Sequence, residues 1–210
     1  MGVRTWWDER VLPRLTHRAC QGADVDRWRA PVCARAEGVV LDIGFGSGPN
    51  LEHYPPVVTR VLTAEPSDLA WELAAPRIES FGRPVERTSP DAADLSTLAD
   101  GSVDTVVTAW ALCTVPEVEA ALREARRVLR PGGALHFVEH SLAPDAGTVR
   151  LQRFVQPVWG RMAGGCHVDR DLPRLIEAAG FEVDLADARY IAPGPMRAWG
   201  WFVTGTARPA

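Results

Sequence analysis

The stretch Leu41–Pro56, LDIGFGSGPNLEHYPP, sets three glycines at alternate positions directly after a short apolar run. Glycine allows backbone conformations that other residues resist, and it lets a ligand approach closely. The spacing differs from the G-x-G-x-x-G of dinucleotide sites, because Pro49 stands where the last glycine belongs. A Walker phosphate loop requires a lysine, and all 23 basic Lys+Arg residues are arginine. The turn therefore predicts a ligand other than a dinucleotide or a nucleoside triphosphate.

Two acidic residues accompany these glycines. Asp42 precedes Gly44 by two residues, and Glu65 ends the next apolar run. We expect Asp42 to face the ligand, where a carboxylate opposes a phosphate but suits a sulfonium cation. We expect Glu65 to accept hydrogen bonds from both hydroxyls of a ribose. Such a ligand matches S-adenosylmethionine, although each feature alone also suits a plain turn, a helix cap or a solvated acid.

Apolar runs and helical spacings alternate along the chain. Strands are expected at 38–43, 59–65, 83–89, 103–110 and 134–140, and helices at 68–81, 117–129 and 171–180, with another starting at Asn50. Helical spacing in 5–37 is broken near 21–24, and 181–191 and 196–208 alternate as an antiparallel strand pair. The pattern predicts one α/β domain, 1–210, with a doubly wound, mainly parallel seven-stranded sheet. Its N-terminal helices, 1–37, are expected to pack on or cap a site built on the core, 38–210.

Composition narrows the function further. The net charge of −4 over 210 residues disfavours nucleic acid as a partner. The four cysteines, Cys20, Cys33, Cys113 and Cys166, stand far apart without a C-x-x-C pair, so no metal is expected and a reducing cytoplasm is favoured. No apolar run is long enough to span a membrane, and no signal peptide is visible at the N-terminus. We expect a cytoplasmic protein; the oligomeric state is not indicated.

Four segments resemble, in order, the motifs of the class I S-adenosylmethionine-dependent methyltransferases: VVLDIGFGSG, the acid Glu65, DGSVDTVV and RRVLRPGGALHFVEH. Further segments, ALCTVPE, PVWGRMAGGCH and GPMRAWGWFVTGTA, are similar to a bacterial branch related to the animal thiol S-methyltransferases. The resemblance implies the Rossmann-like methyltransferase fold and S-adenosylmethionine as cofactor. The apolar anchor of the animal enzymes has no counterpart here, so no membrane insertion is expected.

The resemblance also implies a set of cofactor-binding residues. The loop under the methionine and ribose comprises Asp42, Gly44, Phe45, Gly46, Gly48 and Asn50. Glu65 would hold the ribose, with Pro66 beside the adenine. Asp91 would accept from the adenine amino group with Ala92 facing the ring, and Asp94 is the rival for Asp91. Ala109 and Trp110 would line the methionine arm, with core packing as the alternative for Trp110.

The acceptor side is less defined by motif. His140 is the candidate for accepting the proton of the nucleophile, with orientation of a loop as its alternative role. The substrate pocket is expected to comprise Trp159, Met162, Cys166, His167 and Tyr190, although Trp159 and Met162 also suit core packing. Adjacent residues in an extended turn point apart, which favours a lining role for Cys166 and His167 over a nucleophile–base pair.

These features lead to one main hypothesis and several alternatives. The main one is methyl transfer from S-adenosylmethionine to a small, fairly apolar acceptor, by resemblance a thiol. The same motifs fit N-, O- or C-methylation of a quinone, a lipid-like or a specialised metabolite. A protein that binds the cofactor without turnover is a third hypothesis, which the intact loop and acids disfavour. A nucleotide-dependent oxidoreductase is a fourth, and Pro49 argues against it.

Overall fold

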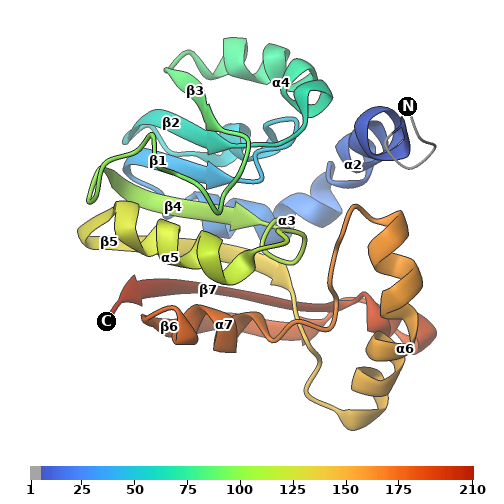
Figure 1. Ribbon diagram of the computed structural model, residues 1–210. Helices are drawn as coiled ribbons and strands as arrows, with labels where there is room; N and C mark the ends of the chain where they lie inside the picture. Colours follow the sequence, from blue (N-terminus) through green and yellow to red (C-terminus); the bar gives the residue numbers. More distant parts are fainter. Residues whose placement is uncertain (1–5) are drawn as a thin grey trace.

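A computed structural model describes residues 6–210 and shows a seven-stranded sheet with the order β3-β2-β1-β4-β5-β7-β6 (Figure 1). The strands are β1 (Gly38–Ile43), β2 (Val58–Ala64), β3 (Val85–Ser89), β4 (Val103–Ala109), β5 (Leu129–His140), β6 (Phe181–Tyr190) and β7 (Trp201–Pro209). The first five strands pair in parallel, and β7 is antiparallel to both of its neighbours. The predicted doubly wound sheet and its closing antiparallel pair are confirmed.

The sheet has a core on each face, because its central strands are apolar on both sides. Val40 packs with α3 (Ala23–Cys33) and α4 (Asp68–Phe81), while its neighbour Leu41 packs with α5 (Val118–Val128) and α7 (Leu172–Ala178). Both residues are fully buried. Successive side chains of β1 therefore point to opposite faces of the sheet and pack against different helices.

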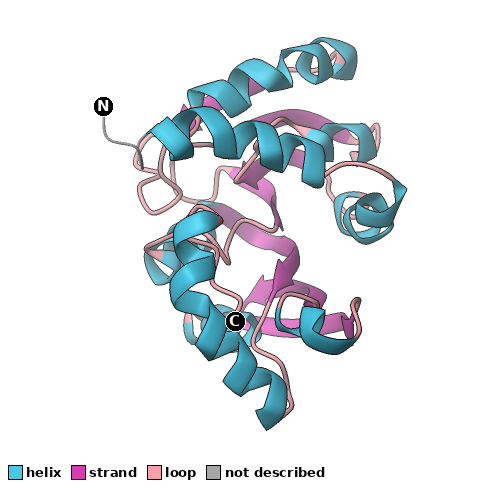
Figure 2. Cartoon of the chain, turned by 90° about the vertical axis from the view of Figure 1, so that its right-hand side faces the viewer, coloured by secondary structure: helices cyan, strands magenta, loops and turns pink. Residues whose placement is uncertain are grey.

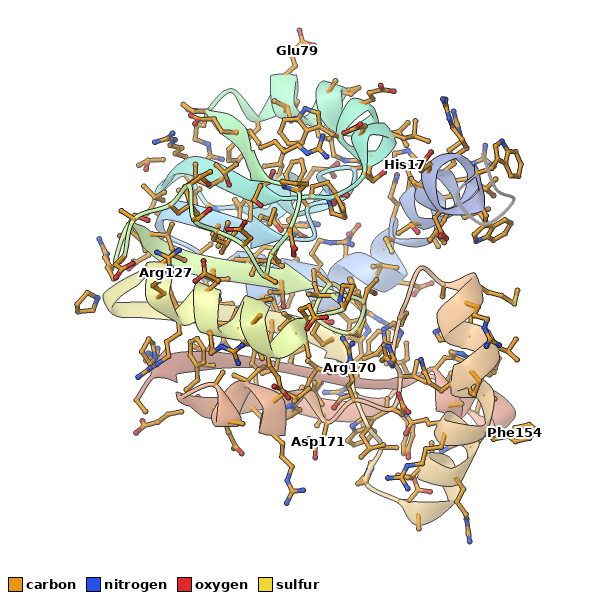
Figure 3. The ribbon with its side chains drawn as sticks, viewed as in Figure 1. His17, Glu79, Arg127, Phe154, Arg170 and Asp171 are labelled. Carbon is orange, nitrogen blue, oxygen red and sulfur yellow. The ribbon has the colours of Figure 1, made fainter. Side chains whose placement is uncertain are left out.

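The N-terminal segment forms two helices with a break where the sequence predicts one. A π-helical turn, η1 (Trp7–Val11), leads into α2 (Leu12–Ala19), and α3 follows after Gly22, whose φ of 97° favours glycine. Thr5, where helical spacing begins, lies outside the described residues. Helix α2 lies near the carboxyl ends of the parallel strands, and His17 points from it towards them (Figure 3), whereas α3 packs on one face of the sheet.

Several predicted element boundaries differ in the structure. The last strand, expected at 196–208, begins only at Trp201, because residues 194–198 form a 3-10 turn, η3 (Gly194–Ala198). The helix expected from Asn50 is only a 3-10 turn, η2 (Pro49–His53), because Pro55 and Pro56 follow at once and cannot continue a helix. The strand expected at 134–140 begins earlier, so β5 follows α5 without an intervening loop. None of these differences alters the predicted sheet.

Helix α6 (Ala146–Met162) was not predicted, and its polarity is the reverse of an ordinary surface helix. Its buried side chains are Thr148, Gln152 and Gln156. Three large apolar residues lie on the outside, among them Phe154, which is 82% exposed (Figure 3). A search for a buried apolar stripe therefore misses this helix. Within residues 6–210, no helix has both the length and the hydropathy needed to cross a bilayer.

Both α2 and α6 lie at the end of the sheet where β1, β2 and β4 finish (Figure 1). The perpendicular view shows helices around this end (Figure 2). In open sheets of this topology, ligands bind outside the carboxyl ends of the strands, where the strand order reverses. Here the order reverses between β1 and β4, so the site is sought in the loops that follow these strands.

Candidate active site

The glycine loop after β1 has the conformation that its sequence demands. Gly44, Gly46 and Gly48 have φ values of 71°, 58° and 74°, in the left-handed region that other residues avoid. A Cβ on Gly44 would lie 2.4 Å from the Cβ of Ala111, so a side chain there would clash. A Cβ on Gly46 would meet nothing closer than the Gly44 carbonyl oxygen at 3.9 Å. Gly44 is thus required by packing, whereas a Cβ on Gly46 would make only ordinary van der Waals contact.

Glu65 lies directly after β2 and is tied to the same loop. Its Oε2 accepts a hydrogen bond from the Gly46 amide at 2.6 Å, and its Oε1 accepts one from the Ser67 amide at 2.8 Å. Burial raises the pKa of Glu65, and these two amides act against that rise. A carboxylate has further lone pairs for ribose hydroxyls. The neighbouring Pro66 is exposed.

Asp42 does not face a ligand, which corrects the expectation from sequence. Its side chain is fully buried, and Asn50 donates to both carboxylate oxygens at 3.0 Å. The Tyr54 hydroxyl donates to Oδ2 at 2.8 Å. Burial raises the pKa of Asp42 to about 7. The reason is that the η2 turn packs over this end of β1, so Asp42 and Asn50 hold the glycine loop from beneath.

The choice between Asp91 and Asp94 stays open. Oδ1 of Asp91 accepts from the Ala93 amide at 2.8 Å, and Oδ1 of Asp94 accepts from the Ser96 amide at 3.1 Å. Both side chains are exposed, whereas Ala92 between them is buried. Hydrogen bonds from Ser96 lower the pKa of Asp94. Each acid thus stabilises its own turn and has oxygen lone pairs left over for an amino group.

Trp110, directly after β4, has an unusual backbone and an incomplete set of hydrogen bonds. Its φ of 56° makes it the one non-glycine residue with a positive φ in the described part of the chain. Its amide donates to the Val138 carbonyl at 2.8 Å, and its ring packs on Phe202 with centroids 5.6 Å apart. The indole Nε1 is buried without a hydrogen-bond partner among residues 6–210. Backbone strain and a partnerless donor are typical of a ligand site rather than of plain core.

Arg29 in α3 belongs to this region, and no sequence signal distinguished it from the other arginines. Its side chain is only 1% exposed, and its guanidinium lies 5.2 Å from the centre of the Trp110 ring. It donates to Asp26 at 2.6 Å and to the Cys20 carbonyl at 2.9 Å. A second N-terminal contact joins Nδ1 of His17 in α2 to the hydroxyl of Ser47 in the glycine loop at 2.8 Å. The N-terminal helices therefore contact both the loop and the Trp110 ring.

On the acceptor side, three side chains from separate segments converge. The sulfur atoms of Cys113 and Cys166 are 3.8 Å apart, and Nδ1 of His140 lies 3.7 Å from the Cys113 sulfur. The two thiols are buried and His140 is partly exposed. The His140 ring packs edge-on against Phe202 at 4.8 Å, the same ring that contacts Trp110. Phe202 thus joins the cluster to the residues expected along the methionine arm.

Buried polar groups hold the turn that carries Cys113. The Glu139 carboxylate accepts from the backbone amides of Ala111, Leu112 and Cys113, at 2.9 to 3.2 Å, and from the Thr108 hydroxyl at 3.0 Å. Arg170, labelled in Figure 3, donates to the carbonyls of Leu112 and Val115 at 2.8 and 2.7 Å. Because Glu139 is fully buried, each of these amides would be costly to leave unpaired.

Cys166 is held from the other side by α6. Gln156 donates to the Cys166 carbonyl and accepts from the Val168 amide, both at 3.0 Å, and the His167 amide donates to the Cys113 carbonyl at 2.7 Å. A hydrogen bond from Cys113 and contact with His140 lower the pKa of the Cys166 thiol, while the pKa of Cys113 is raised. The expectation of no metal rests on the wide spacing of the cysteines along the sequence. In the fold, Cys113 and Cys166 nevertheless lie side by side.

The remaining residues predicted for the substrate pocket divide. Trp159 packs on Trp199, at 5.5 Å between centroids, beside the two cysteines. The side chain of His167 is 42% exposed, with Nδ1 at 3.6 Å from Asp169. Met162 is 57% exposed, and its carbonyl accepts from the Trp7 indole. The Tyr190 hydroxyl donates to Asp145, the N-cap of α6. The structure thus places Trp159 and Cys166 together, while Met162 lies at the surface and Tyr190 fastens α6.

Comparison with known proteins identifies the family. Residues 41–137 match the family model described as a methyltransferase domain. Thiol S-methyltransferase TMT1A of Homo sapiens is 36% identical over 149 residues, covering 68% of this chain and 59% of that protein. Thiol S-methyltransferase TMT1B of Rattus norvegicus is 35% identical over 156 residues, covering 71% of this chain and 62% of that protein.

Solved structures show the same fold. The trans-methyltransferase CalH in its complex with SAH has a TM-score of 0.64 and 21% identity, covering 99% of this chain and 62% of that chain. The chain spans less than two thirds of the length of the two thiol S-methyltransferases, 59% and 62%. The family match, the identities above 30% and the common fold show that this chain belongs to the S-adenosylmethionine-dependent methyltransferases.

Proposed function

We propose that the protein transfers the methyl group of S-adenosylmethionine to a small-molecule thiol. The observation that carries the proposal is the Phe202 ring, which contacts both Trp110 and His140. It joins a loop suited to the cofactor to a cluster of sulfur and imidazole groups suited to a soft nucleophile. The similarity to thiol S-methyltransferases over about two thirds of this chain supports the same acceptor class.

The residues present fit S-adenosylmethionine, which when bound supplies a methyl group already activated by a sulfonium. Gly46 carries no side chain that would keep a ligand from the loop backbone, Glu65 has lone pairs for the ribose hydroxyls, and the Trp110 indole nitrogen lacks a partner among the described residues. We assign ribose binding to Glu65 and the methionine portion to Trp110. Asp42 acts beneath the loop by fixing η2. Alignment and removal of water are the main contributions that this chemistry asks of a protein.

For the acceptor, we assign the proton-accepting role to His140. A thiol with a pKa near 8.5 is partly ionised at neutral pH and needs little help, whereas a phenol near 10 needs a base. His140→Ala should therefore lose about 10²-fold in turnover of a weakly acidic acceptor and far less with an acidic thiol. A uniform loss, or none, would assign His140 an orienting role.

The acceptor is proposed to be small and apolar, and the protein to act in the cytoplasm. Trp159, Trp199 and Val168 surround the two cysteines and offer apolar contact. Four free cysteines, two of them this close, support a reducing compartment. Aliphatic and aryl thiols should outperform glutathione, whose charges would need to be desolvated. N-, O- or C-methylation is the alternative activity, and no contact among residues 6–210 favours it over S-methylation.

The test is a mass-spectrometric screen with trideuteromethyl-labelled cofactor against thiols, phenols, amines and quinones. The proposal expects the label on sulfur of an apolar thiol, with glutathione slower. A matched pair, Glu65→Ala in the site and Glu86→Ala on the exposed side of β3, separates specific loss from general damage. Label on nitrogen, oxygen or carbon only, or equal turnover of glutathione, would contradict it.

A further inference from the structure

We propose that Cys113, His140 and Cys166 form a binding site for a soft divalent cation of the zinc class, with one coordination position left for another ligand. The three donor atoms all lie within 4.8 Å of one another. They come from the turn after β4, the end of β5 and the segment after α6. No motif in the sequence brings them together.

The spacing of the donors matches a tetrahedral ion. Zinc–thiolate bonds of about 2.3 Å at a tetrahedral angle place two sulfur atoms about 3.8 Å apart, and zinc–imidazole bonds of about 2.0 Å place sulfur and nitrogen about 3.5 Å apart. The observed distances are 3.8 Å between the sulfurs and 3.7 Å between Cys113 and His140 Nδ1. The third pair, Cys166 and His140, lies within 4.8 Å, so a shift of one of these two side chains would complete the tetrahedral spacing.

The kind of donor supports the same conclusion. Thiolate and imidazole select soft and borderline metals, while magnesium and calcium prefer oxygen ligands. Two cysteines and one histidine are also a ligand set of catalytic zinc sites, in which the fourth position holds water or substrate. Both thiols are buried, and a cation between them would stabilise their thiolate forms.

The surroundings hold the ligands in place in advance. Glu139 and Arg170 fix the turn of Cys113, and Gln156 fixes the backbone of Cys166. Phe202 supports the His140 ring from the side. Partners that orient the ligands contribute about 10- to 100-fold to the affinity of a metal site. A disulfide would instead require the sulfurs, now 3.8 Å apart, to approach to about 2.05 Å.

The fourth position suggests a use, and this part rests on the proposed function. A thiol acceptor that binds there loses its proton to solvent and remains as a thiolate. Its sulfur forms the new bond to the methyl carbon, and the bond from that carbon to the sulfonium sulfur breaks, with the electron pair going to the departing thioether. With the cation bound, His140 is a ligand in place of the proton acceptor assigned to it above, and the cation lowers the pKa of the bound thiol instead.

The experiment uses the whole chain without a histidine tag, reduced and treated with chelator, then titrated with cobalt(II) in the absence of cofactor and acceptor. We expect thiolate-to-cobalt charge-transfer bands and the visible bands of tetrahedral cobalt, saturating at one ion per chain and displaced by zinc. Cys113→Ser, Cys166→Ser and His140→Ala should each weaken binding at least about 100-fold. Cys20→Ser, outside the cluster, is the control and should bind as the parent does.

Circular dichroism and cofactor calorimetry on each variant establish that it is folded. Absence of charge-transfer bands in the parent protein, or bands unchanged by Cys113→Ser and Cys166→Ser, would overturn the site. The site would also be overturned if the reduced protein binds no cobalt and mild oxidation lowers the intact mass by two hydrogens, which indicates a disulfide between the two cysteines. A shift of the cobalt bands when an apolar thiol is added supports binding of the acceptor thiolate at the fourth coordination position. If the bands form but do not shift, the site stands and the thiolate role fails, and absence of methyl transfer alone refutes only the proposed function.

Discussion

The two halves of the site are built in different ways. Around the cofactor loop, bonded residues are near in sequence: Glu65 and Gly46 are 19 residues apart, and Asp42 and Asn50 are 8 apart. Around the acceptor cluster they are remote: Cys113 and Cys166 are 53 residues apart, and Arg170 and Leu112 are 58 apart. The residues around the glycine loop, proposed to bind the cofactor (the cofactor half), therefore lie within a short sequence motif. The residues around Cys113 and Cys166, proposed to bind the acceptor (the acceptor half), are brought together only by the folded sheet and α6.

The largest effect is expected from Glu139→Ala, which should break the acceptor half selectively. Three buried amides and the Thr108 hydroxyl lose their acceptor, and unpaired buried donors cost about 1–3 kcal/mol each, so we expect roughly 3–5 kcal/mol off the free energy of unfolding. Urea denaturation measures this. Folded protein at low denaturant should still bind cofactor within a few-fold. A loss below about 1 kcal/mol would show that Glu139 is not the anchor of this half.

Asp42 gives the cofactor half a dependence of stability on pH. Its pKa is about 7 in the fold because burial outweighs the hydrogen bonds of Tyr54 and Asn50 and the charge of Arg29, with Glu65 adding to the rise. The folded state therefore binds the proton more tightly than the unfolded chain. This contribution is fully present below about pH 4 and is lost as pH rises to about 7, at up to roughly 1.4 kcal/mol per pH unit.

The test compares Asp42→Asn with the exposed control Asp68→Asn by urea denaturation between pH 5 and pH 8. Asp42→Asn should remove this component of the pH dependence, and Asp68→Asn should keep it. Parallel curves for the parent and Asp42→Asn would show that Asp42 is ionised throughout this range.

Arg29→Met tests the link between the N-terminal helices and the site. The substitution removes the Arg29 donor from the Cys20 carbonyl and from Asp26, which keeps its contact with His53, and it removes the cation beside Trp110. We therefore expect a loss of about 1.5–3 kcal/mol in stability. Because Arg29 also lowers the pKa of Asp42, the pH dependence described above should move to higher pH. Arg27→Met, on the same helix but exposed, is the matched control. Equal behaviour of the two variants would remove Arg29 from the account.

The smallest effect compares the two sides of α6. Gln156 is buried and bonded to the backbone at Cys166 and Val168, so Gln156→Ala should cost about 1–3 kcal/mol. Phe154, at 82% exposed, should cost less than about 0.5 kcal/mol when changed to alanine. Thermal unfolding of both variants decides the matter. The opposite order would mean that the apolar side of α6 is the one that packs.

The same contrast explains what the sequence could predict. The bounds of β1 and α4 follow from apolar runs and caps, and both agree with the structure. The glycine turn and the contact of Glu65 with it depend on local geometry, which the sequence indicates, and ribose binding by Glu65 stays a prediction. Asp42 was expected to face the ligand but is buried under the η2 turn. The sequence at the end of a strand does not indicate which turn packs over it. Helix α6 and the Cys113–Cys166 pair were missed because a polar buried stripe and a contact across 53 residues leave no periodic signal.

The most direct test of the account is a calorimetric titration of S-adenosylmethionine into the parent protein and into Glu65→Ala, with NADH as the competing ligand. We predict one cofactor bound per chain, no heat from NADH, and an affinity about 10- to 100-fold lower in Glu65→Ala, as expected for lost hydrogen bonds to a charged group. Binding of NADH without binding of S-adenosylmethionine, or an unchanged affinity in a folded Glu65→Ala, would contradict it.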